Sequence, residues 1–149
     1  DFLPAKGTVR TGRTRSPLEL GLDWLVDFKK PNFNGRRALA EEKRNGSNWR
    51  LVKLDIEGNK VANASYIFDN ARGSKNIGFI TSAEWSPICK QNVALGTVQT
   101  PHGEVGSTVW VEIYYQREMH WNREMAEAKV VDKPFWFPPR RSATPPGPF

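Results

Sequence analysis

The sequence predicts a mainly β fold, a small antiparallel β-barrel of about six to seven strands with one short helix near the N-terminus. Two observations support this prediction. Short runs in which apolar and polar residues alternate, rich in β-branched and aromatic side chains, recur along the 149 residues. Clusters of Gly, Asn, Asp and Pro separate these runs. Closure into a barrel is favoured because it removes the edges that many short strands would otherwise expose.

The N-terminal third is expected to contain one strand and the helix. Residues 22–28 (LDWLVDF) begin an alternating apolar pattern, which predicts a half-buried strand with Trp24 in the core or on a barrel face. Residues 34–44 are rich in helix formers, and Asn45 and Gly46 supply a C-terminal stop. We therefore expect a short helix immediately before the remaining strands.

The remaining strands are expected where β-forming residues gather between turn clusters. The strongest run is residues 108–115 (TVWVEIYY). Two apolar runs within residues 77–98 flank a long turn that carries Trp85, Ser86 and Pro87. Further strands are expected at about residues 49–56, 66–68 and 126–131.

The formal net charge is +6, and the basic excess is concentrated near the N-terminus. Residues 1–15 form a polar arm that includes Arg10, Arg13 and Arg15. Such an arm can contact nucleic acid, an acidic partner or the anionic tail of a ligand. Because no groove-reading motif accompanies it, we expect packing on an acidic neighbouring domain and do not expect nucleic acid as a partner.

From the sequence we expect neither a membrane span nor a signal peptide. No apolar run reaches the roughly 20 residues that cross a bilayer. Residues 1–4 have neither the basic nor the apolar region of a secretory signal. The single cysteine, Cys89, excludes an internal disulfide and fits a reducing compartment. These features predict a cytoplasmic protein without a membrane partner.

Motifs of catalysis are missing from the sequence. The two histidines, His102 and His120, lie in or beside expected turns and far from Cys89, so no metal site is expected. No nucleophile elbow occurs, and no pair of carboxylates is spaced for acid–base work, so we expect no catalytic residue in this chain. Trp85 and Trp136 fall outside the strand patterns. A ring held at a barrel rim suits either stacking on an aromatic ligand or packing on another domain.

Several segments resemble, in order and in register, the C-terminal part of the glycine-cleavage T-protein (aminomethyltransferase) superfamily. Residues 16–24 (SPLELGLDW) are similar to the family segment TPLEAGLGW, residues 77–87 (IGFITSAEWSP) to VGxVTSGxxSP, and residues 92–98 (NVALGTV) to NIALAYV. Further similar segments are residues 30–39 (KPNFNGRRAL), 50–54 (RLVKL) and 128–135 (AKVVDKPF). The resemblance implies that residues 16–137 are the family's small C-terminal barrel domain, between an arm or linker at residues 1–15 and a Pro-rich tail at residues 138–149.

This resemblance also implies a chemistry. The family uses tetrahydrofolate to accept a one-carbon unit. Its members include aminomethyltransferases, the C-terminal halves of dimethylglycine and sarcosine oxidising enzymes, and demethylases of dimethylsulfoniopropionate and of methoxylated aromatics. The catalytic carboxylate and most folate contacts of the family lie upstream of the barrel. The implied partners of this chain are therefore upstream folate-binding domains of the same protein and a methylated small-molecule substrate.

Two departures from the family pattern bear on the substrate and the site. Ala83 stands where the family often has Gly, and Trp85 follows two places later, as in the demethylase branch. T-proteins place a tyrosine on the folate side of the cleft shortly after their final Pro-Phe pair, and Arg140 falls near that place here. Arginine there could bind the glutamate carboxylate of folate. The implied cleft residues are Trp85, Ser86, Trp136 and Arg140.

The function expected from the sequence is thus that of the C-terminal domain of a tetrahydrofolate-dependent methyltransferase or demethylase. It would form one wall of the folate and substrate cleft. Three alternatives stay open at this point: the aminomethyltransferase of glycine cleavage, the tail of a flavin-dependent N-methyl-amine dehydrogenase, and a non-enzymatic binding module that uses its basic arm.

Overall fold

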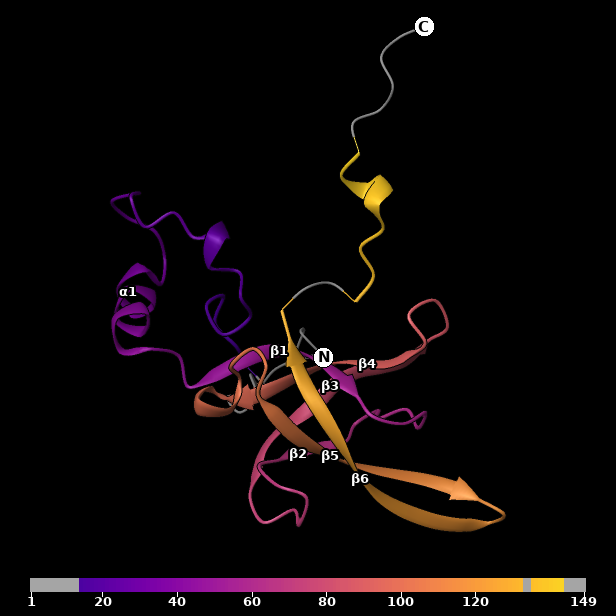
Figure 1. Cartoon of the computed structure of the whole chain (residues 1–149). Coiled ribbons are helices and arrows are strands. Elements are labelled where there is room, and N and C mark those ends of the chain that lie inside the picture. Colours follow the sequence, from indigo (N-terminus) through magenta and orange to yellow (C-terminus); the bar gives the residue numbers. More distant parts are fainter. Residues whose placement is uncertain (1–13, 133–134, 144–149) are drawn as a thin grey trace, which may run out of the picture.

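The computed structural model describes residues 14–132 and 135–143 and shows a closed, six-stranded antiparallel barrel with a helix to one side (Figure 1). Most of the predicted basic arm (residues 1–13) and the end of the predicted tail (residues 144–149) lie outside the described residues. The strands follow one another around the barrel in the order β1-β4-β3-β2-β5-β6, and β6 pairs with β1. The predicted fold class is therefore confirmed. The strands are β1 (Trp49–Ile56), β2 (Tyr66–Phe68), β3 (Asn76–Ser86), β4 (Gln91–Gln99), β5 (Thr108–Arg117) and β6 (His120–Val131).

Side-chain alternation along the strands builds the core. In β1, Val52, Leu54 and Ile56 are buried, and each residue between them is half-buried. This is the pattern of a strand whose one face lines the barrel interior and whose other face is outside. The other strands add further buried side chains, which include Ile67, Ile77, Val98, Val109, Val111, Ile113, Ala126, Ala128 and Val130.

The loop between β1 and β2 is fastened to β3 and β4. A register shift in β3 between Ile80 and Ser82 leaves backbone amides that the loop satisfies. The Ile80 N–H donates to the carbonyl of Ser65 (2.8 Å), and the Ala83 N–H donates to Oδ1 of Asn63 (3.1 Å). Since buried backbone amides need partners, these bonds fix the loop against the middle of β3.

The segment before β1 differs from the prediction. Residues 22–28 do not form a strand; a short 3-10 helix, η2 (Asp23–Leu25), lies within them and buries none of its residues. Backbone bonds there are local; the Leu22 N–H, for example, donates to the carbonyl of Pro17 (2.8 Å). Trp24 is 75% exposed, so it lies neither in the core nor on the barrel. In this segment, the alternation of apolar and polar residues does not correspond to burial of one face against the sheet.

The predicted helix is confirmed as α1 (Arg36–Asn45), which ends at Gly46. The Gly46 N–H donates to the carbonyl of Glu42 (2.7 Å), and its φ of 85° is a conformation that favours glycine. The Glu42 carboxylate accepts hydrogen bonds from the hydroxyls of Ser16 (2.7 Å) and Ser47 (2.6 Å). The helix is therefore tied to the chain on both sides of it, although it buries none of its own residues.

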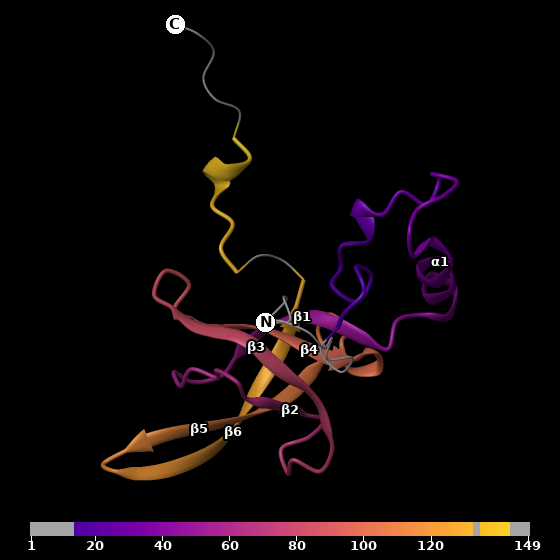
Figure 2. The same ribbon diagram turned by 180° about the vertical axis from the view of Figure 1, so that it is seen from behind.

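Strands β5 and β6 extend beyond the barrel as a two-stranded arm (Figure 2). They pair with each other as far as Arg117 and His120, whereas β5 pairs with β2 over residues 110–112 and β6 pairs with β1 over residues 128–131. The strand predicted at residues 108–115 ends two residues later than predicted, and the strand predicted at residues 126–131 begins six residues earlier, because the pairing continues through residues whose side chains are largely exposed. No helix in the described part of the chain is long and apolar enough to cross a membrane.

Candidate functional site

The candidate site lies at the end of the β3–β4 hairpin. Here Trp85 pairs with Asn92 and Ser86 pairs with Gln91. The connecting turn is closed by the Ser86 hydroxyl, which accepts a hydrogen bond from the Cys89 N–H (3.3 Å). The hydroxyl of Ser86 thus has a structural partner inside the turn itself.

Trp85 lies on the inner face of the hairpin at the barrel rim. Its cross-strand partner Asn92 is 0% exposed and follows the same face as the core residues Ala83 and Ala94. The Asn92 amide donates to the carbonyl of Lys60, which holds the β1–β2 loop over this end of the hairpin. Oδ1 of Asn92 is buried without a hydrogen-bond partner among the described residues. The half-buried ring of Trp85 therefore stands over a buried polar position rather than over a purely apolar core.

Ser86 lies on the opposite face, because neighbouring residues of a strand alternate between its two sides. Glu84 shares this outer face, and so does Gln91, whose side-chain amide donates to Asp55 of β1 (2.8 Å). Trp85 and Ser86, adjacent in sequence, thus face different surroundings. A ligand that touches both side chains would have to lie across the tip of the hairpin.

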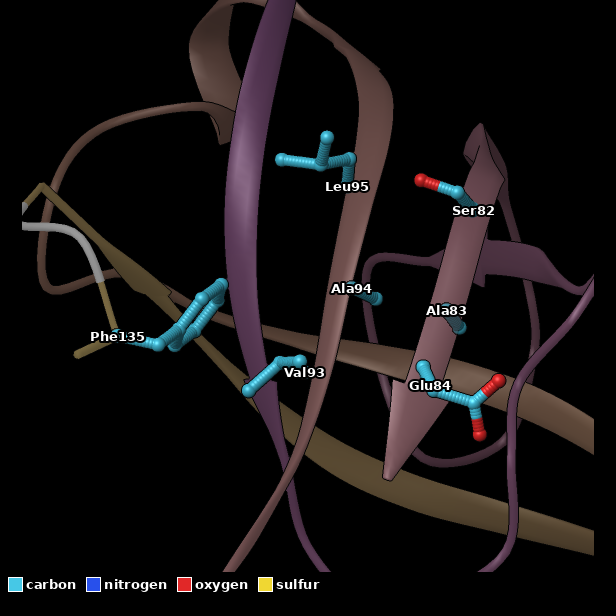
Figure 3. Close-up of a pocket in the computed structure, with 7 residues that line it drawn as sticks. All are labelled: Ser82, Ala83, Glu84, Val93, Ala94, Leu95 and Phe135. Atoms are coloured by element: carbon cyan, nitrogen blue, oxygen red, sulfur yellow. The ribbon is translucent and has the colours of Figure 1, made fainter. Parts of the chain in front are cut away.

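The outer face of the hairpin carries a shallow hollow of about 250 Å³ (Figure 3). In Figure 3 the ring of Phe135, which follows β6, points toward Val93 of β4. Glu84 contributes the one carboxylate among the residues that line this hollow. Ser82 and Leu95 also line the hollow on the outer face, and so do Ala83 and Ala94, which lie next to them in the strands and whose side chains belong to the core. An apolar hollow with a single carboxylate at its margin is suited to binding and holds no acid–base pair.

The C-terminal segment joins the hairpin at its turn. The Cys89 thiol donates a hydrogen bond to the carbonyl of Phe135 (3.2 Å), so residue 135 lies against the turn that Ser86 closes. Trp136 comes next and is 46% exposed. The guanidinium carbon of Arg140 lies 5.7 Å from the centre of the Trp136 ring, within the range of a cation–π contact. The predicted site residues thus fall into two pairs, Trp85 with Ser86 and Trp136 with Arg140. The hydrogen bond from Cys89 to Phe135 holds the segment of the second pair against the hairpin of the first.

Sequence reasoning missed three residues that shape this region. Cys89 entered the sequence analysis only through its lack of a disulfide partner, but its thiol binds the C-terminal segment. Asn92 was assigned to an apolar strand, and Phe135 to the last of the segments that resemble the family, residues 128–135. A signal existed for Asn92, because an amide side chain at an inward-facing position of a strand needs a specific partner.

Ionic chemistry is sparse in this region. Among the described residues, no group of three or more His, Cys, Asp or Glu side chains is placed to hold a metal ion. The clearest electrostatic effect lies on the arm, where a hydrogen bond to Glu112 and its negative charge raise the pKa of Arg123. The hairpin end therefore offers aromatic rings, an arginine and an apolar hollow, which are means of binding.

Comparison with known proteins places the barrel in a family. The family model described as the glycine cleavage T-protein C-terminal barrel domain matches residues 50–136, more than half of the chain. The chain belongs to this family. Its similarity to named relatives extends further. The aminomethyltransferase of Synechococcus elongatus is 34% identical over 122 residues, and that of Prochlorococcus marinus is 36% identical over 126 residues.

The T-protein barrel family also accounts for the observed fold. The crystal structure of the glycine cleavage system aminomethyltransferase T from Bartonella henselae superimposes with a TM-score of 0.66 at 26% sequence identity. That match covers 81% of this chain and 32% of the Bartonella protein. The two sequence relatives are covered to 30% and 31% of their own lengths by matches that take in 81% and 83% of this chain. The chain therefore spans about a third of the length of the aminomethyltransferases that it matches.

Proposed function

We propose that this chain is the C-terminal barrel of a tetrahydrofolate-dependent one-carbon transferase and forms one wall of its folate and substrate cleft. The observation that carries this proposal is the family match over residues 50–136, together with relatives that are named aminomethyltransferases. The catalytic groups would come from the folate-binding region that precedes the barrel in the family. This chain would contribute shape, stacking surface and charge.

The wall that fits this role is the end of the β3–β4 hairpin with the segment after β6. Trp85 and Trp136 offer flat rings of the kind that stack on a pterin or benzoyl ring. Arg140 is exposed and already lies against Trp136, so its guanidinium is available to a carboxylate such as that of the folate glutamate. Ser86 is engaged within its turn and would act by shaping the hairpin tip.

For the substrate, we propose a methylated small molecule, so that the enzyme would be a demethylase. Ala83 and Trp85 in the signature hairpin support this choice. The second candidate is aminomethyl transfer in glycine cleavage, which the names of the relatives favour. The two reactions leave different groups on the folate, a methyl group after demethylation and a methylene bridge after aminomethyl transfer. Mass spectrometry of the folate product therefore decides between them.

The test uses the complete polypeptide that the gene encodes. Tetrahydrofolate binding is measured by calorimetric titration for the wild type and for Trp85→Ala and Arg140→Ala. Each variant is expected to weaken binding by roughly tenfold or more, which is the usual scale for loss of one stacking or charged contact. Trp121→Ala and Arg117→Ala are the matched controls, because both side chains are exposed on the arm.

The controls should bind tetrahydrofolate like the wild type. Unchanged affinity in both Trp85→Ala and Arg140→Ala would show that the cleft lies elsewhere on the barrel. A complete polypeptide that binds no tetrahydrofolate would contradict the proposed function itself.

A further inference from the structure

Beyond the barrel, the arm loses its neighbours on both sides. We call residues 113–126, the outer part of β5 and β6 with the turn between them, the free arm. Strand β2 pairs with β5 only as far as Glu112, and β1 pairs with β6 only from Ala128 onward. The loop after β1 reaches the free arm through Lys60, whose ammonium lies 4.8 Å from the centre of the Tyr115 ring. The two strands otherwise pair with each other, and Figures 1 and 2 both show them projecting away from the barrel.

The outer edge of β6 in the free arm presents backbone groups without partners. The Glu57 N–H donates to the carbonyl of Glu127 (2.8 Å), so residue 127 directs its backbone groups away from β5. Alternate residues of an antiparallel strand direct their N–H and C=O groups to the same side, so those of Met125, Arg123 and Trp121 also point away from β5. None of these three residues has a backbone hydrogen bond on that side to another residue that the structure describes. An unpaired edge of this kind is a template for a further strand.

The side chains of the free arm have the composition of a protein–protein interface. Tyr114, Met119 and Trp121 are exposed to 57%, 89% and 71%. Tyrosine, tryptophan, methionine and arginine are enriched at interfaces, whereas lysine is depleted. The free arm contains two arginines and no lysine. This composition indicates that the partner of the free edge is a protein.

The charge of the free arm fits a partner of its own kind. Its two arginines, Arg117 and Arg123, are balanced by two glutamates, Glu118 and Glu124, so its net charge is zero with His120 neutral, whereas that of the whole chain is +6. A balanced surface gives no preference for an acidic or a basic protein, and it lacks the basic excess that nucleic acid requires. Such a surface also does not repel a second copy of itself.

Two-fold symmetry restricts how two copies of this edge can pair. In an antiparallel pair of identical strands, one residue lies on the axis opposite its own copy, and residues at equal distances on either side of it lie opposite one another. An axis at Arg123 or Glu124 would place like charges opposite each other, which is destabilising. An axis at Trp121 would bring Glu118 to Glu124 of the second copy. An axis at Met125 would extend the pairing to the residue whose carbonyl the loop after β1 already occupies.

An axis at Asn122 avoids all of these conflicts. It places Trp121 opposite Arg123 of the second copy, where the ring and the guanidinium can form a cation–π contact. It also places His120 opposite Glu124 of the second copy, a pair without like charges. By symmetry, each of these contacts forms twice. The sequence of β6 is therefore complementary to itself in this one register.

We propose that the β6 edge of the free arm pairs with the same edge of a second copy about a two-fold axis at Asn122, so that the two arms form one four-stranded ribbon. The strand order in this ribbon is β5-β6-β6-β5. Pairing over residues 120–124 gives partners to the outward backbone groups of Trp121 and Arg123 in both copies. Because so short a pairing makes a small interface, the association is weak and depends on concentration. The inference does not rest on the proposed function, since its partner is the chain itself.

An engineered disulfide tests the register. The backbone groups of Asn122 point toward β5, so residue 122 and its copy would form a non-hydrogen-bonded pair with Cα atoms about 4.5 Å apart, a separation that a disulfide can span. In the complete polypeptide that the gene encodes, Asn122→Cys should therefore form a covalent dimer on mild oxidation. The wild type, which contains Cys89, measures the background.

The matched control for this disulfide is Glu124→Cys. In the proposed register residue 124 lies about 13 Å along the strand from its own copy, so this variant should stay at the background level of the wild type. Equal yields of covalent dimer from the two variants would overturn the proposal, as would the absence of a dimer from Asn122→Cys.

Proline variants test the edge itself. The Trp121 N–H points to the β6 edge, and the N–H of Gln116, its cross-strand partner, points to the opposite edge of the arm. Proline at either position therefore removes no hydrogen bond within the arm. Sedimentation of the complete polypeptide at concentrations up to about 1 mM, the range of weak association, should show a reversible dimer. Trp121→Pro should raise the Kd of this dimer at least about tenfold, because it removes a hydrogen bond and a ring contact from both copies, whereas Gln116→Pro should leave the Kd unchanged.

Three results of these measurements would overturn the proposal. The first is a wild type that stays monomeric over this range of concentration. The second is a dimer that Trp121→Pro leaves intact or that Gln116→Pro weakens equally. The third is slow hydrogen exchange at the amides of Trp121, Arg123 and Met125 in a monomer, which would assign the edge to another part of the polypeptide.

Discussion

Replacing Gly78 with alanine should disrupt the pairing of β3 with β4. A Cβ atom at this position would lie 2.0 Å from the Thr97 carbonyl oxygen and 2.9 Å from Cα of Val98. Both atoms belong to the backbone of β4, and Gly78 pairs directly with Val98, so no side-chain movement can relieve the clash. The two strands would have to move apart. We expect a loss of about 3 kcal/mol, the upper end for overpacking a well-packed site.

Such a loss is a large fraction of the roughly 5–15 kcal/mol that stabilises a domain of this kind. It corresponds to a fall in Tm of about 10 °C or more. Urea unfolding followed by circular dichroism measures it in the 149-residue chain. Gly106→Ala is the control, because a Cβ there meets nothing within 4 Å and the cost comes from the positive φ of 88° alone, about 1–2 kcal/mol. If Gly78→Ala costs no more than Gly106→Ala, the close approach of β3 and β4 is wrong.

Two further substitutions test other parts of the structure. Asn92→Ala removes a fully buried amide that donates to the Lys60 carbonyl. It should lower the free energy of unfolding, measured in urea, by about 1–3 kcal/mol, whereas Asn122→Ala on the arm should lower it much less. Equal losses in the two variants would argue against the hydrogen bond between Asn92 and Lys60. Arg123→Gln breaks the pair with Glu112. Folding raises the pKa of Arg123, so the ion pair contributes its full stabilisation at any pH below the pKa of arginine in the unfolded state. That stabilisation is lost only as the pH rises through the pKa of Arg123 in the folded state. The decrease in Tm should therefore be the same at pH 7 and pH 9, and a decrease that disappears by pH 9 would contradict this assignment.

The sequence predicted the parts of the fold that local rules govern. Alternation from Trp49 to Ile56 predicted β1 because one face of the strand lines a core. Gly46 marked the end of α1 because a helix commonly stops at a glycine with positive φ. These signals depend on neighbours in the chain, so they are readable without the tertiary structure.

Elements that depend on distant contacts were harder to predict. Trp24 lies in an apolar run that resembles a strand, yet its ring faces solvent in this chain. The ribbon at residues 116–125 was missed for a different reason: an arm that is largely exposed on both faces has no reason to alternate between apolar and polar residues.

For the candidate site, the sequence supplied residues but not their orientation. The resemblance pointed to Trp85, Ser86, Trp136 and Arg140, and the structure places all four near the end of one hairpin or on the segment attached to it. That Trp85 and Ser86 face opposite sides follows from strand pairing, which the sequence did not locate at this turn. The contact of Cys89 with the C-terminal segment joins residues 46 positions apart and left no local signal.

We propose that tetrahydrofolate lies against the end of the β3–β4 hairpin and the segment after β6. Hydrogen exchange of the complete polypeptide, with and without tetrahydrofolate, tests it most directly. We predict that the ligand slows exchange in residues 84–92 and 135–141 and leaves the arm at residues 114–121 unchanged. Exchange that slows elsewhere while residues 84–92 and 135–141 stay as they were would show that this barrel does not form a wall of the cleft.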